Sequence, residues 1–267
     1  MTNPPASATS APTKRYAFNK VPAVTLVFWM IKVLATTVGE TAADVLSTTF
    51  HLGLVVTSYV MAAAFIIVLV IQVKSKKYVP ATYWITVVFI SVVGTLISDN
   101  LVDNLGVSLV TTTLIFSVAL AAVFIAWYLS ERTLSVHTIV TTRRELFYWA
   151  AILFTFSLGT SGGDLLSERL GLGYGVALAV FAGGIAVVYG LYRLHVLNSV
   201  LAFWIAYILT RPLGASAGDL LTQAPSDGGL GMGRLPITGV ILVLVVILVS
   251  YLTVQERKHP PQPVEIT

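Results

Sequence analysis

Residues 28–46 read FWMIKVLATTVGETAADVL, and the pattern of this stretch returns three times later in the chain. Each copy has a Phe or Tyr before a Trp, a Gly ten residues after the Trp, an Asp five residues after the Gly and a Leu two residues beyond the Asp. The later copies are residues 83–101, 148–166 and 203–221, and no gap is needed to align them. An internal repeat of this kind decides the architecture before any single residue does. We therefore predict four copies of one structural unit.

The composition indicates a membrane protein. Of the 267 residues, 56% are hydrophobic and 10% are charged, whereas a soluble domain has about 25% charged residues. Long apolar runs recur along the chain, which is typical of a polytopic helical membrane protein. The absence of cysteine excludes disulfides and thiolate metal sites. We find no phosphate loop, nucleophile arrangement or metalloprotease signature, so we expect neither an enzyme nor a cofactor, and no nucleic-acid partner.

The predicted fold is all-α, with eight transmembrane helices that form four two-helix repeats in parallel orientation. The helices that carry the pattern are called the motif helices, and we expect them at about 22–48, 82–103, 147–167 and 200–222. The helices between them are more uniformly apolar and are called the outer helices. We expect the outer helices at about 53–73, 107–128, 174–194 and 236–254.

The spacing of the copies groups the repeats in pairs. Neighbouring copies lie 55 residues apart, except that the second and third copies lie 65 residues apart. We therefore expect repeats one and two at 21–129 and repeats three and four at 147–255, with a cytoplasmic linker at 130–146. Residues 1–20 are predicted to be a disordered cytoplasmic tail, and residues 256–267 a second cytoplasmic tail.

Basic residues set the expected orientation. Twelve Lys and Arg residues fall on the side of the two termini, and only Arg169 and Arg234 fall on the opposite side. Cytoplasmic loops carry the excess of Lys and Arg, so we expect both termini in the cytoplasm. Each motif Trp then lies near the cytoplasmic interface, where its ring is expected to anchor the helix.

The motif helices carry acidic residues within membrane depth. Each motif Asp lies fifteen residues after its Trp, which is about 22 Å along a helix in a hydrocarbon core of about 30 Å. Residues four before, three after and four after the Asp share its helix face, and this face is rich in oxygen atoms. It holds seven of the twelve acidic residues, here called the stripe carboxylates: Glu40, Asp44, Asp99, Asp103, Asp164, Glu168 and Asp219.

These carboxylates predict a cation site. An ionisable group in a membrane span costs several kcal/mol unless it faces the bundle interior or finds a partner. Carboxylates with hydroxyl groups suit Mg²⁺, Ca²⁺, Mn²⁺ or protons. Neighbouring carboxylates cannot all ionise cheaply, so a cation can displace protons from them. The predicted metal ligands are Asp44, Asp99, Asp164 and Asp219, with Glu40 as the next candidate.

Small residues accompany every motif Asp. The residue before the Asp is small and stands four residues after the motif Gly, a spacing that lets helix backbones approach closely. We therefore expect the motif helices to pack tightly at the level of the Asp residues. The predicted packing positions are Gly39, Gly94, Gly159, Gly214, Ala43, Ser98, Gly163 and Gly218.

Two basic residues lie inside motif helices and are candidates for a gate or a counter-charge. Lys32 stands three residues after Trp29, so its stem can reach back to the cytoplasmic interface, and we favour this snorkelling arrangement. Arg211 lies about 10 Å deep and precedes Pro212, which disturbs the helix. Arg211 is expected either to neutralise an Asp or gate a pathway, or to bind backbone carbonyl groups.

The four [FY]-W-x9-G-x4-D-x-L hairpins resemble a family of bacterial integral membrane proteins described as uncharacterised or membrane-anchored, over about residues 20–255. The resemblance implies a multi-pass protein of the bacterial inner membrane and brings no assigned activity. The segment GETAAD at 39–44 is also similar to small cation exchangers built on a repeated E-x-G-D-[KR]-[ST] motif. Its spacing differs and its basic residue is missing, so this likeness implies only repeated acidic helices.

We therefore expect secondary transport of a cation, either a divalent metal or a proton-coupled ion, with lipid and the cation as partners. One alternative is a membrane scaffold or sensor partner, whose Asp residues only end or cap helices and leave no cavity between them. Another alternative is a channel, which needs a continuous polar path. The outer helices offer few polar residues for such a path.

Overall fold

The computed structural model describes residues 15–260 and 262–266. Within these residues the fold is all-α with eight long helices, as predicted. The helices are α1 (Leu26–Asp44), α2 (Gly53–Lys74), α3 (Pro80–Asp99), α4 (Leu109–Glu131), α5 (Thr142–Asp164), α6 (Tyr174–Arg193), α7 (Ser199–Thr222) and α8 (Arg234–Lys258). Seven of these described helices are long and apolar enough to cross a membrane, and α5 is the exception. The first turn of α5 contains Arg143, Arg144 and Glu145, and its second half is rich in Gly, Ser and Thr.

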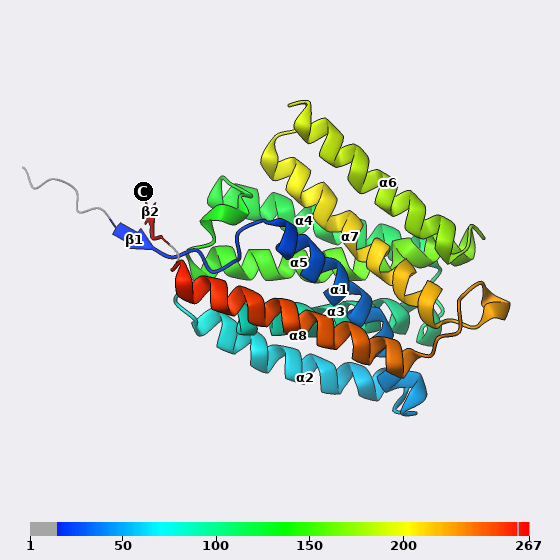
Figure 1. The fold of residues 1–267 in the computed structure, drawn as a ribbon. Helices are drawn as coiled ribbons and strands as arrows, with labels where there is room; N and C mark the ends of the chain where they lie inside the picture. The colour runs from blue at the N-terminus through cyan, green and yellow to red at the C-terminus, as the bar shows by residue number, and fades with distance from the viewer. Residues whose placement is uncertain (1–14, 261, 267) are drawn as a thin grey trace, which may run out of the picture.

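The four motif helices form a closed ring at the centre of the bundle. Helix α1 packs against α3, α3 against α5, α5 against α7, and α7 against α1 (Figure 1). Most of their side chains are buried, whereas the outer helices expose most of theirs. The polar second half of α5 is therefore shielded by protein, and the outer helices present the apolar surface that suits lipid.

Each outer helix packs on the next motif helix along the chain. Helix α2 packs on α3, α4 on α5, and α6 on α7 (Figure 1). Helix α8 has no following motif helix and packs on α1 instead. The first and last helices are therefore in contact, and the repeats close into a circle.

The motif glycines lie at the contacts between neighbouring motif helices. A Cβ atom on Gly39 would overlap Ser91, and one on Gly94 would lie 2.6 Å from the Cβ of Phe156. In the same way Gly159 abuts Arg211, and Gly214 abuts Thr36. Each contacted residue lies seven positions after its own motif Trp. One glycine contact is thus repeated four times around the ring, with the close backbone approach that small residues allow.

The aromatic pairs close one end of the ring. The Phe or Tyr of each pair contacts the Trp of the next motif helix, with ring centroids 5.5–6.2 Å apart. Trp84, Trp149 and Trp204 are buried, and only Trp29 is half-buried. The prediction that these Trp rings anchor the helices at the interface is therefore wrong for three of them. The eight rings form a cluster that we call the aromatic plug: Phe28, Trp29, Tyr83, Trp84, Tyr148, Trp149, Phe203 and Trp204.

Helix capping moves several predicted boundaries. Helix α1 begins at Leu26 because Thr25 caps it, accepting a hydrogen bond from the backbone N–H of Phe28 (3.2 Å). Helix α5 begins five residues earlier than predicted because Thr141 caps it. The linker between α4 and α5 therefore covers 132–141 rather than 130–146, and it contains a short 3₁₀ turn.

The predicted disorder of the tail at 1–20 does not extend to its last residues. Residues 1–14 lie outside the described residues, but β1 (Arg15–Ala17) pairs antiparallel with β2 (Val264–Ile266). Lys20 is buried and forms an ion pair of 2.7 Å with Glu145 at the start of α5. The two ends of the chain therefore meet beside the plugged end of the ring.

Candidate cation site

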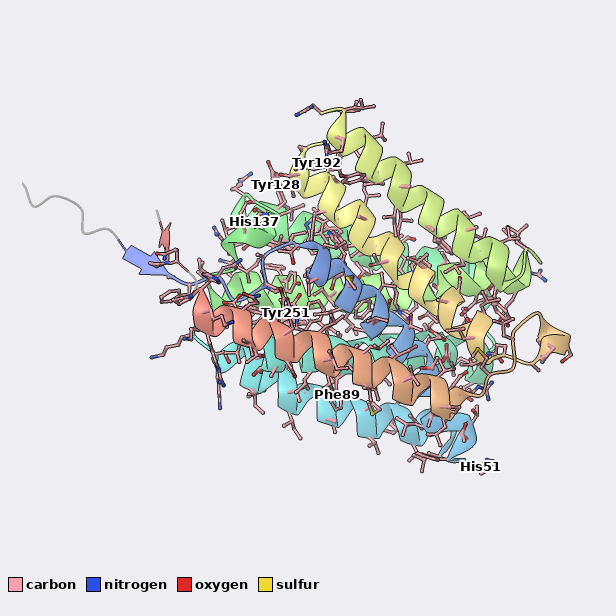
Figure 2. All side chains as sticks on the ribbon, viewed as in Figure 1. His51, Phe89, Tyr128, His137, Tyr192 and Tyr251 are labelled. Carbon is pink, nitrogen blue, oxygen red and sulfur yellow. The ribbon has the colours of Figure 1, made fainter. Side chains whose placement is uncertain are left out.

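All seven stripe carboxylates line one cavity of about 140 Å³, which we call the acidic cavity. Val102, Leu109 and Gln223 complete its lining. The cavity lies at the end of the bundle opposite the aromatic plug, and we call this end the acidic end. His51 marks the acidic end and His137 marks the plugged end (Figure 2). The structure thus brings together every acidic residue that the spacing placed on one stripe.

The helix ends around the cavity are unusual. The residues directly after Asp44, Asp99 and Asp164 form π-helical turns at Val45–Thr49, Asn100–Asn104 and Leu165–Arg169. Such turns are rare and are frequently found at functional sites. Helix α7 continues as an α-helix past Asp219, which is the most buried of the four motif Asp residues. Three of the four repeats therefore share one local geometry at the cavity wall.

Glu40, one of the residues that line the acidic cavity, forms a buried ion pair. Arg211 is fully buried, and its Nη2 atom lies 2.8 Å from Oε2 of Glu40. The same Nη2 donates hydrogen bonds to the hydroxyl groups of Thr95 and Thr160. Glu40, Thr95 and Thr160 occupy the same position in their repeats, directly after the motif Gly. One guanidinium group therefore ties α7 to the other three motif helices.

Arg211 binds groups of both kinds that were expected, a carboxylate and a backbone carbonyl. Its charge partner is Glu40 rather than a motif Asp, and Nη1 also donates to the carbonyl oxygen of Thr36 (2.9 Å). Both a carboxylate and a backbone carbonyl are thus bound. Breaking a buried pair of this kind by removing one partner costs about 3–5 kcal/mol, because it leaves an uncompensated charge.

A second basic residue, Arg234, lies at the rim of the cavity. Its Nε atom lies 2.9 Å from Oδ2 of Asp44, and its other nitrogens donate to Thr48 (3.0 Å) and Gln223 (3.1 Å). Sequence reasoning did not place Arg234 in the site. The available signal for Arg234 was that it is one of only two basic residues expected on the side of the membrane opposite the termini.

The acidic cavity holds more carboxyl groups than basic partners. Among the described residues, five stripe carboxylates have no Lys or Arg partner in an ion pair: Asp99, Asp103, Asp164, Glu168 and Asp219. Glu168 accepts a hydrogen bond from the Tyr174 hydroxyl (3.1 Å), and Asp219 accepts one from Gln223 (3.4 Å). Neither contact supplies a positive charge. A cation that enters the cavity would therefore meet carboxyl groups for which no basic side chain competes, and could displace protons from them.

The carboxylates surround the cavity without forming a finished coordination shell. Within the part of the chain that the structure describes, no three His, Cys, Asp or Glu side chains gather closely enough to hold a metal ion. The cavity is larger than the volume that one water molecule needs. This geometry suits a cation that keeps part of its water shell, as Mg²⁺ commonly does. Direct coordination by the four motif Asp residues stays a prediction.

A family model described as Repeat of Unknown Function (DUF347) matches residues 27–78, 82–133, 147–195 and 202–258, which together are most of the chain. The chain belongs to the DUF347 family. Each DUF347 repeat covers one motif helix and the outer helix that follows it, which confirms the predicted four-repeat organisation. No similarity to a curated protein or to a solved structure was found.

The DUF347 repeats differ at the position three residues after the Trp, where the first repeat has Lys32. Lys32 does not snorkel, because its side chain is fully buried inside the ring. Its Nζ atom lies 3.8 Å from the ring centroid of Phe156 and 4.1 Å from that of Tyr207. Desolvated cation–π contacts are worth about 2 kcal/mol. Lys32, Thr36, Glu40 and Asp44 follow one another at intervals of four residues, and this helical spacing was the available signal for an inward Lys32.

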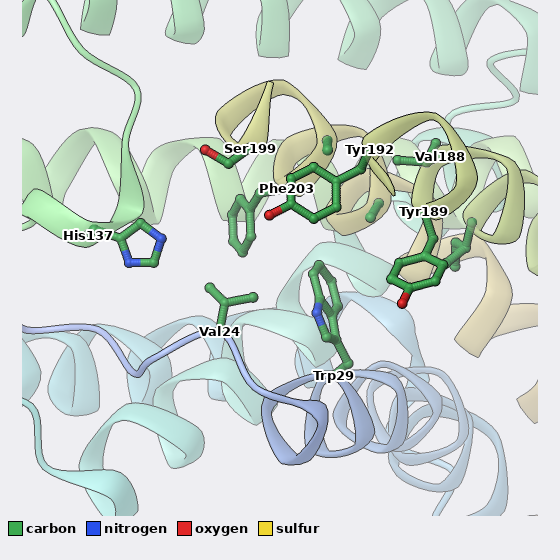
Figure 3. Close-up of a pocket in the computed structure, with 11 residues that line it drawn as sticks. Val24, Trp29, His137, Val188, Tyr189, Tyr192, Ser199 and Phe203 are labelled. Carbon is green, nitrogen blue, oxygen red and sulfur yellow. The ribbon is translucent and has the colours of Figure 1, made fainter. Parts of the chain in front are cut away.

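A second cavity, of about 420 Å³, lies between α1 and the α6–α7 pair of the DUF347 bundle. Trp29 and Val24 face Phe203, Tyr189 and Tyr192 across it (Figure 3). None of the stripe carboxylates lines it. Its aromatic and aliphatic walls suit a lipid chain rather than an ion, and its presence explains why Trp29 is the least buried motif Trp.

Proposed function

We propose that this protein is a multi-pass membrane transporter for a cation, rather than an enzyme. One observation carries the proposal: seven carboxylates from all four motif helices line one cavity, and five of them have no basic partner among the described residues. Acid groups buried within a membrane bundle are costly and mark ion pathways. A divalent metal ion with part of its water shell, or a proton-coupled ion, is the proposed substrate.

The arrangement along the ring axis supports a transport cycle. The acidic cavity lies at one end, Glu40 in its wall is paired with the buried Arg211, and the aromatic plug lies at the other end. A cation in the cavity would compete with Arg211 for Glu40. The site would thus be reachable from one side at a time, which transport by alternating access requires.

Two other functions fit the geometry less well. A scaffold with carboxylates among the lipid headgroups leaves no cavity between the motif helices, but the acidic cavity lies between them. A channel needs a continuous polar path, and the aromatic plug interrupts such a path in this conformation. The basic residues at the ends of α2, α4, α6 and α8 support an inner-membrane orientation with both termini in the cytoplasm.

The proposal is tested by flux measurements on the full-length protein in liposomes that contain a Mn²⁺-sensitive dye. We expect Mn²⁺ entry, and we expect Asp99→Asn, Asp164→Asn and Asp219→Asn each to slow it by about tenfold, since about 1.4 kcal/mol of attraction is lost with each charge. Parallel assays with Mg²⁺ and Ca²⁺ establish selectivity.

The matched control is Asp227→Asn, because Asp227 is an exposed Asp of the α7–α8 connection and does not line the cavity. This variant should transport at the wild-type rate. Wild-type rates in all three cavity variants, with each protein folded, would overturn the proposal.

A further inference from the structure

The basic groups of Lys32 and Arg211 both lie close to the aromatic ring of Phe156. The Phe156 ring lies 3.8 Å from Nζ of Lys32 and 5.9 Å from Cζ of Arg211. The only carboxylate paired with either group among the described residues is Glu40, which binds Arg211. Protonation of Lys32 therefore changes the net charge of this buried region by one, and no carboxylate pairs with Lys32 among the described residues.

The amine of Lys32 is held without hydrogen bonds. Among the described residues its Nζ has no hydrogen-bond partner, although the side chain is fully buried. Its Nζ lies over the aromatic faces of Phe156 and Tyr207. These faces attract the ammonium form, and they also leave room for the neutral amine. A proton can thus be gained or lost at Nζ without any hydrogen bond being broken.

The ionisable groups near Lys32 come from three helices of the ring. On α7 they are Arg211 and Tyr207, and towards the plug the hydroxyl groups of Tyr83 on α3 and Tyr148 on α5 bind each other. Glu40 lies two turns further along α1, and α8 has no ionisable residue between Arg234 and Tyr251. Arg211 is therefore the charged group through which the acidic cavity can act on Lys32.

We propose that Lys32 is a proton-binding site and that its proton is the coupling ion of the transport cycle. This inference rests on the proposed function. When a cation in the acidic cavity engages Glu40, the positive charge of Arg211 is no longer balanced and repels the Lys32 ammonium group. An N–H bond of Lys32 then breaks, and the proton passes to water on the side to which the bundle is open. The amine takes up a proton again after the cation has left, which makes the protein a cation–proton antiporter.

The flux experiment uses liposomes loaded with a Mn²⁺-sensitive dye and a pH-sensitive dye. In the wild type, Mn²⁺ entry should raise the internal pH. Lys32→Met keeps a similar length but cannot bind a proton, so the pH change per Mn²⁺ ion should fall at least fivefold while Mn²⁺ entry down its gradient persists. Lys76→Met is the control, because Lys76 is exposed in the α2–α3 turn, and it should retain wild-type coupling. An unchanged ratio in folded Lys32→Met would overturn the proposal.

A second measurement reads the proton site directly. In protein labelled with ¹³C at lysine Cε, the resonance that is missing from Lys32→Met should titrate within the range in which the protein stays folded. If Lys32→Met does not fold, Lys32→Arg identifies the resonance and should show no coupled pH change. A resonance that stays at the ammonium position throughout would refute the proton site. Absent Mn²⁺ flux in the wild type with a titrating Lys32 would instead refute the proposed transport and its coupling role while leaving the proton site standing.

Discussion

At the scale of single residues, the four repeats share one packing arrangement, but the Glu40–Arg211 ion pair occurs only once. The position seven residues after the motif Trp holds Thr36, Ser91, Phe156 and Arg211, and each of these packs against the glycine of a neighbouring helix. Only the fourth repeat places a charge there, and only the first repeat supplies a carboxylate, Glu40, one position after its glycine. The repeats thus share their packing but divide the charged roles among themselves.

Replacing Arg211 by Met should therefore destabilise the protein strongly. The substitution leaves Glu40 buried without its partner, at a cost of about 3–5 kcal/mol, so we expect the thermal midpoint in detergent to fall by about 10 °C. The double variant Glu40→Gln/Arg211→Met removes both charges and should recover most of this loss.

The matched control is Arg257→Met, because Arg257 is exposed near the end of α8. Its midpoint should stay at the wild-type value. Equal midpoints for the single Arg211 variant and the double variant would show that the ion pair contributes nothing beyond side-chain packing.

The stripe carboxylates and the glycine contacts could be predicted because spacing along a helix fixes which residues share a face. Their convergence on one cavity follows from the ring. Lys32 shows the limit of this reasoning, because its long stem is compatible with an inward position or with an interfacial one. The neighbours that hold it, Phe156 and Tyr207, come from helices whose place beside α1 cannot be read from the chain.

At the scale of the helices, glycines at the ring contacts differ physically from glycines elsewhere in the same helices. A methyl group added at Gly94 would lie 2.6 Å from the Cβ of Phe156 and 3.2 Å from the backbone nitrogen of Ser157. A methyl group added at Gly162 would have no neighbouring atom within 4 Å. The two sites thus separate close helix packing from intrinsic helix propensity.

We predict opposite effects for alanine at these two positions. Gly94→Ala forces α3 and α5 apart and should cost about 1–3 kcal/mol, whereas Gly162→Ala should be neutral or stabilising by up to about 1 kcal/mol. Thermal unfolding followed by circular dichroism in detergent measures both. Equal effects of the two substitutions would mean that the ring contact at Gly94 is not close in solution.

Seven of the eight helices could be predicted because their apolar runs are long enough to span a membrane, and α5 could be predicted because it carries a copy of the motif. Their ends were harder to place, because capping rather than apolarity decides them. Thr141 begins α5 ahead of the polar residues Arg143, Arg144 and Glu145, which a search for apolar runs excludes. The π-helical turns after three of the motif Asp residues could not be predicted from the spacing of the motif residues. Such a turn changes which backbone groups bind each other and does not change the order of the residues.

At the scale of the whole molecule, the repeat in the sequence differs from the unit that packs. A DUF347 repeat joins α1 to α2, yet α2 packs on α3, and α8 completes the circle by packing on α1. The four copies are alike, so the chain alone does not reveal which motif helices are neighbours. Contacts in the folded protein, such as that of Gly214 with Thr36, join the last repeat to the first and so define the ring.

A closed ring of repeats should tolerate a change in where the chain begins. The loop between α6 and α7 is exposed at Leu194 and Val196, and β1 pairs with β2, so the natural ends can be joined. A circular permutant that begins in 194–198 moves one whole repeat to the front and keeps the direction of every helix. We expect it to fold with a thermal midpoint within about 5 °C of the wild type, since the same helix contacts form.

A permutant opened between α7 and α8 is the contrasting case. There the backbone of Leu230 and Met232 donates hydrogen bonds to α7, and Arg234 holds Asp44 at the cavity rim. Opening this segment breaks those contacts and moves the start of the chain to the opposite side of the membrane. We therefore expect a lower thermal midpoint and slower Mn²⁺ entry than in the wild type. If the permutant opened at 194–198 failed to fold while this one succeeded, the covalent link between α6 and α7, and not the packing of the repeats in a circle, would hold that side of the bundle together.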